Sequence, residues 1–238
     1  MGQIIVGIRA RDAFVVATNE PDDTALQNPS GVVALGRVCL LVEEYDPAKQ
    51  LVLTDHLRGA VSLDAADAGF DALSLELRNV LLALRQADPA SSDQYRVHIV
   101  GTDPTRYGGW HYSYIQATTT VVPGNVGQFD VQPNPPHWLG HDVFLVYGPD
   151  SVMRFLCHEV NPAQLDVGGS KRLAMTILLE MQMLGWLPPA IAIGWFGQDR
   201  RFRFAAPAEV AEMRQECAAR LSRAAPAFAR LMAELRRS

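Results

Sequence analysis

Lysine is scarce in this 238-residue chain, in which Lys49 and Lys171 are the only two. A mechanism that depends on a catalytic lysine therefore has few candidate residues. The formal net charge is -5, whereas proteins that bind nucleic acids normally carry a basic patch. We therefore expect no nucleic-acid partner.

Cysteines and long apolar runs are also few. Cys39, Cys157 and Cys217 are odd in number and widely spaced, which favours free thiols in a reducing compartment over a disulfide framework. The longest apolar stretch, residues 174–197, is interrupted by a glutamate and a pair of prolines, so it is unlike a membrane span. The N-terminus lacks the basic and apolar segments of a secretory signal. We expect a protein of the cytoplasm and nucleus with no membrane partner.

Residues 3–19, QIIVGIRARDAFVVATN, form the clearest local pattern and predict a β-hairpin. Two apolar, β-branched runs flank a polar, turn-prone segment at residues 9–12. Both runs are nearly continuous rather than alternating. This indicates strands that are covered on both faces, as in a layered fold.

The rest of the chain divides into blocks of strands and blocks of helices. Strands are predicted at residues 31–35, 38–44, 95–101, 110–120, 143–147, 190–196 and 201–204. Helices are predicted at residues 48–63, 67–87, 150–160, 168–184 and 207–237, with an interruption at Pro226. For the LVL stretch at residues 51–53, a strand that pairs back onto residues 38–44 is the alternative. Asp46 and Ser170 are the predicted N-caps of the first and fourth helices. Residues 121–140 are rich in proline and glycine and predict a long surface excursion.

This block order favours an α+β fold over strict βαβ winding. We predict a four-layer αββα sandwich, in which two antiparallel sheets lie between two helix layers. Residues 1–204 would form the domain, and residues 205–238 a C-terminal helical extension.

The block order and the opening hairpin together resemble a proteasome beta-type subunit with the N-terminal-nucleophile hydrolase fold. The matching residues are Val6-Gly7-Ile8, a short basic turn containing Asp12, and Val15-Val16-Ala17. Looser matches are the strand-to-helix passage at residues 38–58, VHIVGTD at 97–103 and PAIAIGWF at 189–196. The resemblance covers about residues 3–204.

In that family an N-terminal threonine, freed from a propeptide, is the nucleophile, and an Asp and a Lys nearby set the protonation states. Matching the Val-Gly-Ile motif puts Gln3 at the nucleophile position and Asn19 at the Asp position. A carboxamide cannot attack an acyl carbon, and the region around Leu35, where the family lysine would lie, has no lysine. The chain also begins at the mature boundary, so we expect no propeptide.

The resemblance therefore implies a non-catalytic subunit of a 20S proteasome core particle that needs no cofactor. Its partners would be other proteasome beta and alpha subunits in a multi-ring hetero-oligomer. Several apolar residues lie outside the predicted core and indicate a partner surface. They are Phe129, Trp138, Leu139, Leu221, Phe228, Leu231 and Leu235.

Other chemistries have weaker support. A stand-alone hydrolase would need a cysteine nucleophile, Cys39 or Cys157. Residues 168–171, GGSK, precede a helix and could bind an anion, although the spacing of a phosphate loop is absent. His137 and His141, with Asp142, have a metal-ligand spacing, but the surrounding prolines and glycine disfavour the helix that would bring them together. We predict no metal site and interpret these histidines as loop residues at a subunit contact.

Overall fold

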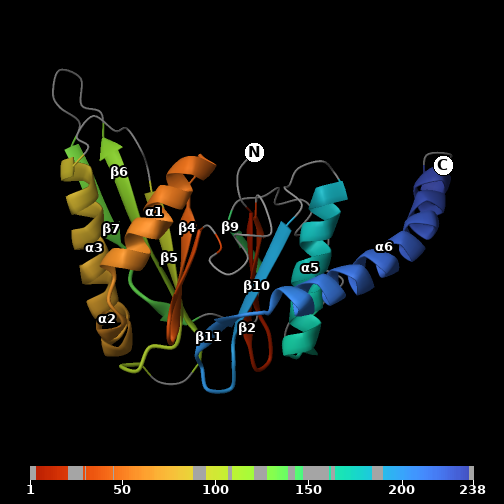
Figure 1. The fold of residues 1–238 in the computed structure, drawn as a ribbon, viewed down its shortest axis with the longest axis horizontal. Coiled ribbons are helices and arrows are strands. Elements are labelled where there is room, and N and C mark those ends of the chain that lie inside the picture. Colours follow the sequence, from red (N-terminus) through yellow and green to blue (C-terminus); the bar gives the residue numbers. More distant parts are fainter. Residues whose placement is uncertain are drawn as a thin grey trace.

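The computed structural model describes residues 4–20, 29, 31–44, 46–87, 95–106, 109–120, 128–138, 143–146, 161, 164–183 and 190–235. These residues form an α+β fold with two antiparallel sheets (Figure 1). The sheets lie face to face, with helices on the outer face of each (Figure 1). The predicted fold class is confirmed.

The first sheet has the strand order β11-β10-β2-β1-β9. Its strands are β1 (Ile5–Arg9), β2 (Phe14–Glu20), β9 (Val143–Val146), β10 (Ala190–Phe196) and β11 (Phe202–Phe204). The predicted hairpin is present as β1 and β2, with Ile8 opposite Val15. The second predicted hairpin is present as β10 and β11.

The second sheet has the order β3-β4-β5-β6-β7, and β8 pairs with β6 beside β7. Its strands are β3 (Val32–Leu35), β4 (Val38–Glu43), β5 (Tyr95–Gly101), β6 (His111–Thr120), β7 (Gln128–Pro133) and β8 (His137–Trp138). The prediction of a surface excursion over residues 121–140 is therefore wrong for β7 and β8. Val131 is buried in the sheet's core, and this non-local pairing with β6 forms the strand.

Three helices, α1 (Pro47–Ala60), α2 (Leu63–Ala68) and α3 (Phe70–Ala87), cover the second sheet. The Asp46 side chain accepts hydrogen bonds from the backbone N–H groups of Ala48 and Lys49, so its predicted capping role is confirmed. Two further helices, α5 (Val167–Met183) and α6 (Pro207–Leu235), cover the first sheet. The helix predicted at residues 150–160 lies outside the described residues.

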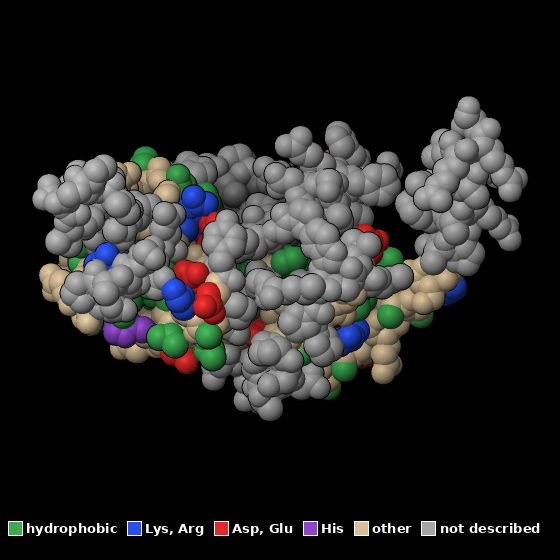
Figure 2. Space-filling view, turned by 90° about the horizontal axis from the view of Figure 1, so that it is seen from above, with side chains coloured by type: hydrophobic (Ala, Val, Ile, Leu, Met, Phe, Trp, Pro, Cys, Tyr) green, Lys and Arg blue, Asp and Glu red, His purple; other side chains and the backbone are tan. Residues whose placement is uncertain are grey.

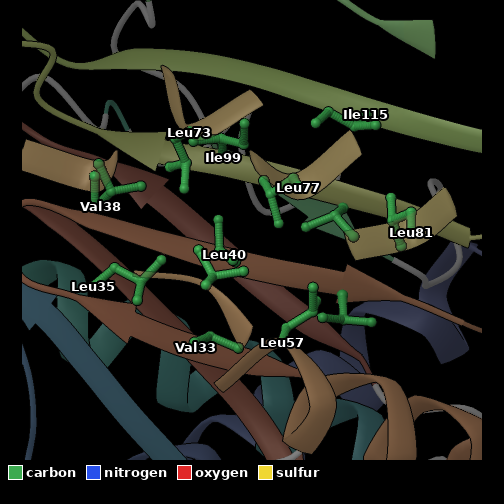
Figure 3. Close-up of a cluster of buried hydrophobic side chains, with 14 of the residues drawn as sticks. Val33, Leu35, Val38, Leu40, Leu57, Leu73, Leu77, Leu81, Ile99 and Ile115 are labelled. Atoms are coloured by element: carbon green, nitrogen blue, oxygen red, sulfur yellow. The ribbon is translucent and has the colours of Figure 1, made fainter. Parts of the chain in front are cut away.

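Three stacked apolar clusters define the layers. The first joins the second sheet to α1–α3, and Figure 3 shows Leu57 and Leu73 facing the strand residue Leu40. The second joins the first sheet to α5 and α6. The third, which we call the inter-sheet cluster, contains Ile5, Phe14, Val16, Val32, Cys39, Leu41, Val100, Trp110, Phe196 and Phe202. Because each inner strand contributes alternate residues to two clusters, both of its faces are buried, as the continuous apolar runs predicted.

Helix α6 belongs partly to the core. Val210 and Cys217 are buried against α5 and the first sheet, and Leu221 packs beside them. Leu221 is therefore not away from the core as predicted. The helix also runs through Pro226 without the predicted interruption, since a proline can bend a helix without ending it. Figure 1 shows α6 curving, with its C-terminal half projecting from the rest of the described chain.

Among the described residues, no helix combines the length and the apolar character needed to cross a membrane.

Candidate functional site

The start of β1 is the place where the family nucleophile would lie. Gln3 itself is outside the described residues, but its neighbour Ile4 donates its backbone N–H to Asn19 Oδ1 at 2.6 Å. Asn19 is 2 % exposed and follows Thr18, which pairs with Ile5. The carboxamide oxygen of Asn19 therefore closes the open end of the hairpin. It has no carboxylate to accept a proton in a reaction.

Leu35 lies at the other end of the sandwich. Its neighbour Gly36 accepts a hydrogen bond from the backbone N–H of Phe202, which pairs with Phe196 at the C-terminal end of β10. Asn19 instead pairs with Ile191, near the N-terminal end of β10. The region around Leu35, where the family lysine is expected, therefore lies away from Asn19. The end of β3 nearest to Asn19 is Val32, and it has no lysine either.

The inter-sheet layer becomes polar at the end where β1 starts. Glu43 lies two residues after Leu41 on β4, and His98 two residues before Val100 on β5, so both share the face of the inter-sheet cluster. His98 Nε2 is 2.8 Å from Glu43 Oε2, and His98 Nδ1 is 2.6 Å from the hydroxyl of Tyr112 on β6. These three side chains form a continuous hydrogen-bonded network.

Arg96 and Tyr114 extend this network along the sheet. Arg96 Nη1 lies 3.1 Å from Glu43 Oε2 and 3.4 Å from Oε1. Its guanidinium carbon lies 5.4 Å from the centre of the Tyr114 ring, a cation–π distance. The backbone register places Arg96 opposite Glu43 and Tyr114 opposite His98, so the sheet itself assembles the group.

The protonation of this network follows from burial and charge. Burial alone would raise the pKa of Glu43, but hydrogen bonding and charge from His98 and Arg96 lower it below its ordinary value. Burial raises the pKa of Tyr112 to about 12. A carboxylate, an imidazole and a hydroxyl in series have the connectivity of a nucleophilic triad. In this sheet the three side chains are partly or fully buried, and they satisfy one another's hydrogen-bonding groups.

Figure 2 is a view onto this end of the molecule. Over the half formed by the second sheet and its helices, described acidic and basic side chains lie next to one another (Figure 2). Within the described part of this face they form no continuous field of one sign.

The described cysteines are unsuited to nucleophilic attack. Cys39 is fully buried in the inter-sheet cluster, and burial raises its pKa, whereas a reactive cysteine needs an accessible thiolate. Cys217 is buried on the face of α6 that packs against α5, with its Sγ 3.8 Å from the carbonyl oxygen of Arg172. Cys157 lies outside the described residues.

The GGSK segment at residues 168–171 is already occupied by other groups. Asp166 Oδ1 accepts the backbone N–H of Gly169 at 2.7 Å, so Asp166, rather than the predicted Ser170, caps α5 with its side chain. Lys171 Nζ lies 2.7 Å from Glu209 Oε1 and 3.1 Å from the centre of the Trp195 ring. Because a carboxylate covers the helix N-terminus and the lysine is paired, the segment offers no anion site.

The predicted histidine pair is only partly described. His137 belongs to β8 and lies opposite Tyr112, so its backbone is in a strand rather than in the predicted loop. His141 and Asp142 are outside the described residues. No group of three or more potential metal-binding side chains lies together in the described part of the chain.

The network around His98 was not predicted from the sequence. Its members come from three strands and are brought together only by strand register. A local signal exists, because His98 interrupts the apolar run of YRVHIVG and a polar residue in a buried strand needs a partner.

Compared with known proteins, the sequence matches no protein-family model, and no curated protein shows significant similarity to it.

Proposed function

We propose that this chain is a non-catalytic beta-type subunit of a proteasome-like core particle. It builds the ring and the chamber in which neighbouring threonine-protease subunits degrade proteins. The observation that carries the proposal is the start of β1 within an αββα sandwich. The resemblance of the hairpin motif puts Gln3 at the family's nucleophile position in the sequence, and the amide oxygen of Asn19 accepts the backbone N–H of Ile4.

The pattern of α6 supports a role in assembly. Val210, Cys217 and Leu221 lie on the face of α6 that packs into the core. The same spacing of three and four residues continues through Ala224, Phe228, Leu231 and Leu235. This second part belongs to the half of α6 that projects in Figure 1. An apolar stripe continued along a projecting helix fits a neighbouring subunit.

A groove on the opposite side of the molecule offers a second contact surface. It has a volume of about 650 Å³ and lies between α3 and the end of β7, where Leu75 is 58 % exposed. Its lining combines Leu75 and Val131 with Asp71, Arg78 and the segment 132–136. We propose that α6 contacts one neighbour in the ring and that this groove contacts the neighbour on the other side. We place the particle in the cytoplasm and nucleus.

Native mass spectrometry of the protein purified from its source cells tests the proposal. We expect a particle of several hundred kilodaltons that contains related subunits. The peptidase activity of the particle should be unchanged when Gln3 is replaced by alanine, because the neighbouring subunits supply the nucleophile. A monomer or small homo-oligomer, with stoichiometric labelling of Cys157 by a thiol probe and loss of activity, would instead favour the cysteine hydrolase.

A further inference from the structure

A second polar site lies at the opposite end of the inter-sheet layer, at the turns after β1 and β10 (Figure 1). A cavity of about 220 Å³ opens there among three segments that are far apart in the sequence. The β1–β2 turn contributes Arg9, Arg11 and Asp12; the segment after β5 contributes Thr102; and the β10–β11 turn contributes Arg200. The charged lining is three arginines and one aspartate, or a formal +2, on a chain with net charge -5.

Arg9 is an unusual arginine because it is only 7 % exposed. Its guanidinium carbon lies 5.7 Å from the centre of the Trp110 ring, and Nη1 donates a long 3.4 Å hydrogen bond to the Ala13 carbonyl. Its Nε is buried and has no hydrogen-bond partner in the described part of the chain. Burial lowers the pKa of Arg9, and the charge of Asp12 only partly opposes this. A buried guanidinium with an open donor is costly unless an anion satisfies it.

Thr102 provides an independent sign of a missing partner. It is 5 % exposed, and its buried Oγ1 forms no hydrogen bond with any described residue. Thr102 and Arg9 line the same cavity from different sheets. Two nearly buried polar side chains, each with one unpartnered buried atom, therefore lie beside one cavity.

The remaining two arginines are also available. Neither Arg11 nor Arg200 forms an ion pair within the described residues, and both are exposed at the cavity mouth. Arg200 has a φ of 58°, and its backbone N–H bonds the Gly197 carbonyl, which fixes the tight β10–β11 turn. The turn holds Arg200 at the cavity, where it forms no ion pair with any residue that the structure describes.

We propose that this cavity binds a phosphate-type oxyanion, either inorganic phosphate or the phosphate group of a small molecule. A dianion balances the formal +2 of the lining, and planar guanidinium groups bind phosphate through paired hydrogen bonds. The Thr102 hydroxyl adds a neutral donor. The cavity has about seven times the ~30 Å³ that one water occupies in the liquid, so it has space for an ion of this size.

The site is separate from the start of β1 and does not depend on the proposed function. The full-length chain is titrated with sodium phosphate by calorimetry, and its melting temperature is measured in phosphate and in sodium chloride of equal ionic strength. Bound phosphate should raise the melting temperature in a saturable way, because it binds only the folded state. Chloride should not reproduce the rise.

Variants locate the binding. Arg200→Asn removes the guanidinium and keeps a residue that tolerates positive φ. This variant should weaken phosphate binding by about tenfold. Thr102→Val should also weaken phosphate binding. Arg201→Gln is the matched control, because Arg201 is the next residue but does not line the cavity, and it should bind as the unmodified chain does. Equal stabilisation by chloride, equal binding by all variants, or tighter binding of acetate than of phosphate would each overturn the proposal.

Discussion

At the scale of single residues, the two ends of the inter-sheet layer differ in whether a buried charge has partners within the protein. At one end, Glu43 is bonded to both His98 and Arg96, so its charge is compensated within the protein. At the other end, the buried Nε of Arg9 has no hydrogen-bond partner among the described residues. The first arrangement stabilises the fold by itself, whereas the second leaves stabilisation to be gained from a ligand.

Glu43 should make the free energy of unfolding depend on pH in the acid range. Its pKa is lower in the folded chain than in the unfolded one, so the folded state binds fewer protons. The stabilisation is therefore complete above the ordinary glutamate pKa of about 4.3 and is lost as the pH falls through the lowered folded value. Glu43→Gln should cost about 1–3 kcal/mol at neutral pH and should flatten the fall in stability below about pH 4.3.

Urea unfolding between pH 3 and 7 measures this effect. Glu212→Gln is the control, because Glu212 is exposed on α6. An equally steep acid loss in Glu43→Gln and in the unmodified chain would contradict the role assigned to Glu43.

At the scale of elements, a close approach between strands depends on Gly101 at the end of β5. A Cβ added there would lie 2.2 Å from the Arg37 carbonyl oxygen and 2.8 Å from the Val38 Cα, both backbone atoms that cannot easily move. Gly101→Ala should therefore destabilise the chain by about 1–3 kcal/mol or more. Gly59 in α1 is the matched control, because nothing lies within 4 Å of its added Cβ.

Gly59→Ala should stabilise the chain by about 0.5–1 kcal/mol through its helix propensity. Thermal or urea unfolding of the two variants should shift in opposite directions. A loss of stability in both would show that the site-specific contact with Arg37 is not the cause.

Element prediction from the sequence succeeded where the signal is local. The β1–β2 runs and the apolar stripe of α3 need only neighbouring residues to be read, and both elements are present. β7 was missed because QFDVQP has only two apolar residues in its short alternation, ends in proline and lies in a segment rich in proline and glycine. Its strand form depends on pairing with β6, a non-local contact.

Site prediction has the same physical limit. The candidate positions Gln3 and Asn19 came from one hairpin motif, which is contiguous in the sequence. Arg9, Thr102 and Arg200 each look ordinary in their own segments. Only the stacking of two sheets brings them to one cavity, so no local pattern could have indicated it.

At the scale of the whole molecule, the two halves of α6 should separate folding from assembly. Ending the chain after residue 222 keeps Val210, Cys217 and Leu221 in the core and should leave the melting temperature of the isolated subunit nearly unchanged. Ending it after residue 206 exposes the second apolar cluster and should destabilise the fold strongly, since losing buried side chains of this kind costs about 2–5 kcal/mol each.

Under the proposed function, both truncated chains should fail to enter the core particle. Circular dichroism melts and native mass spectrometry distinguish the two effects. Normal incorporation of the chain that ends at residue 222 would contradict the role of the projecting half.

The projecting half of α6 also makes the two sides of the molecule unequal. The 14 residues from 222 to 235 extend about 21 Å at 1.5 Å per residue. When such an arm is received by a different surface of the next copy or relative, the contact is head-to-tail rather than two-fold. Head-to-tail contacts close into a ring when the rotation between neighbours allows it, and every subunit of that ring then points in the same direction. Under the proposed function, the shape of one helix would thus set the direction of the ring.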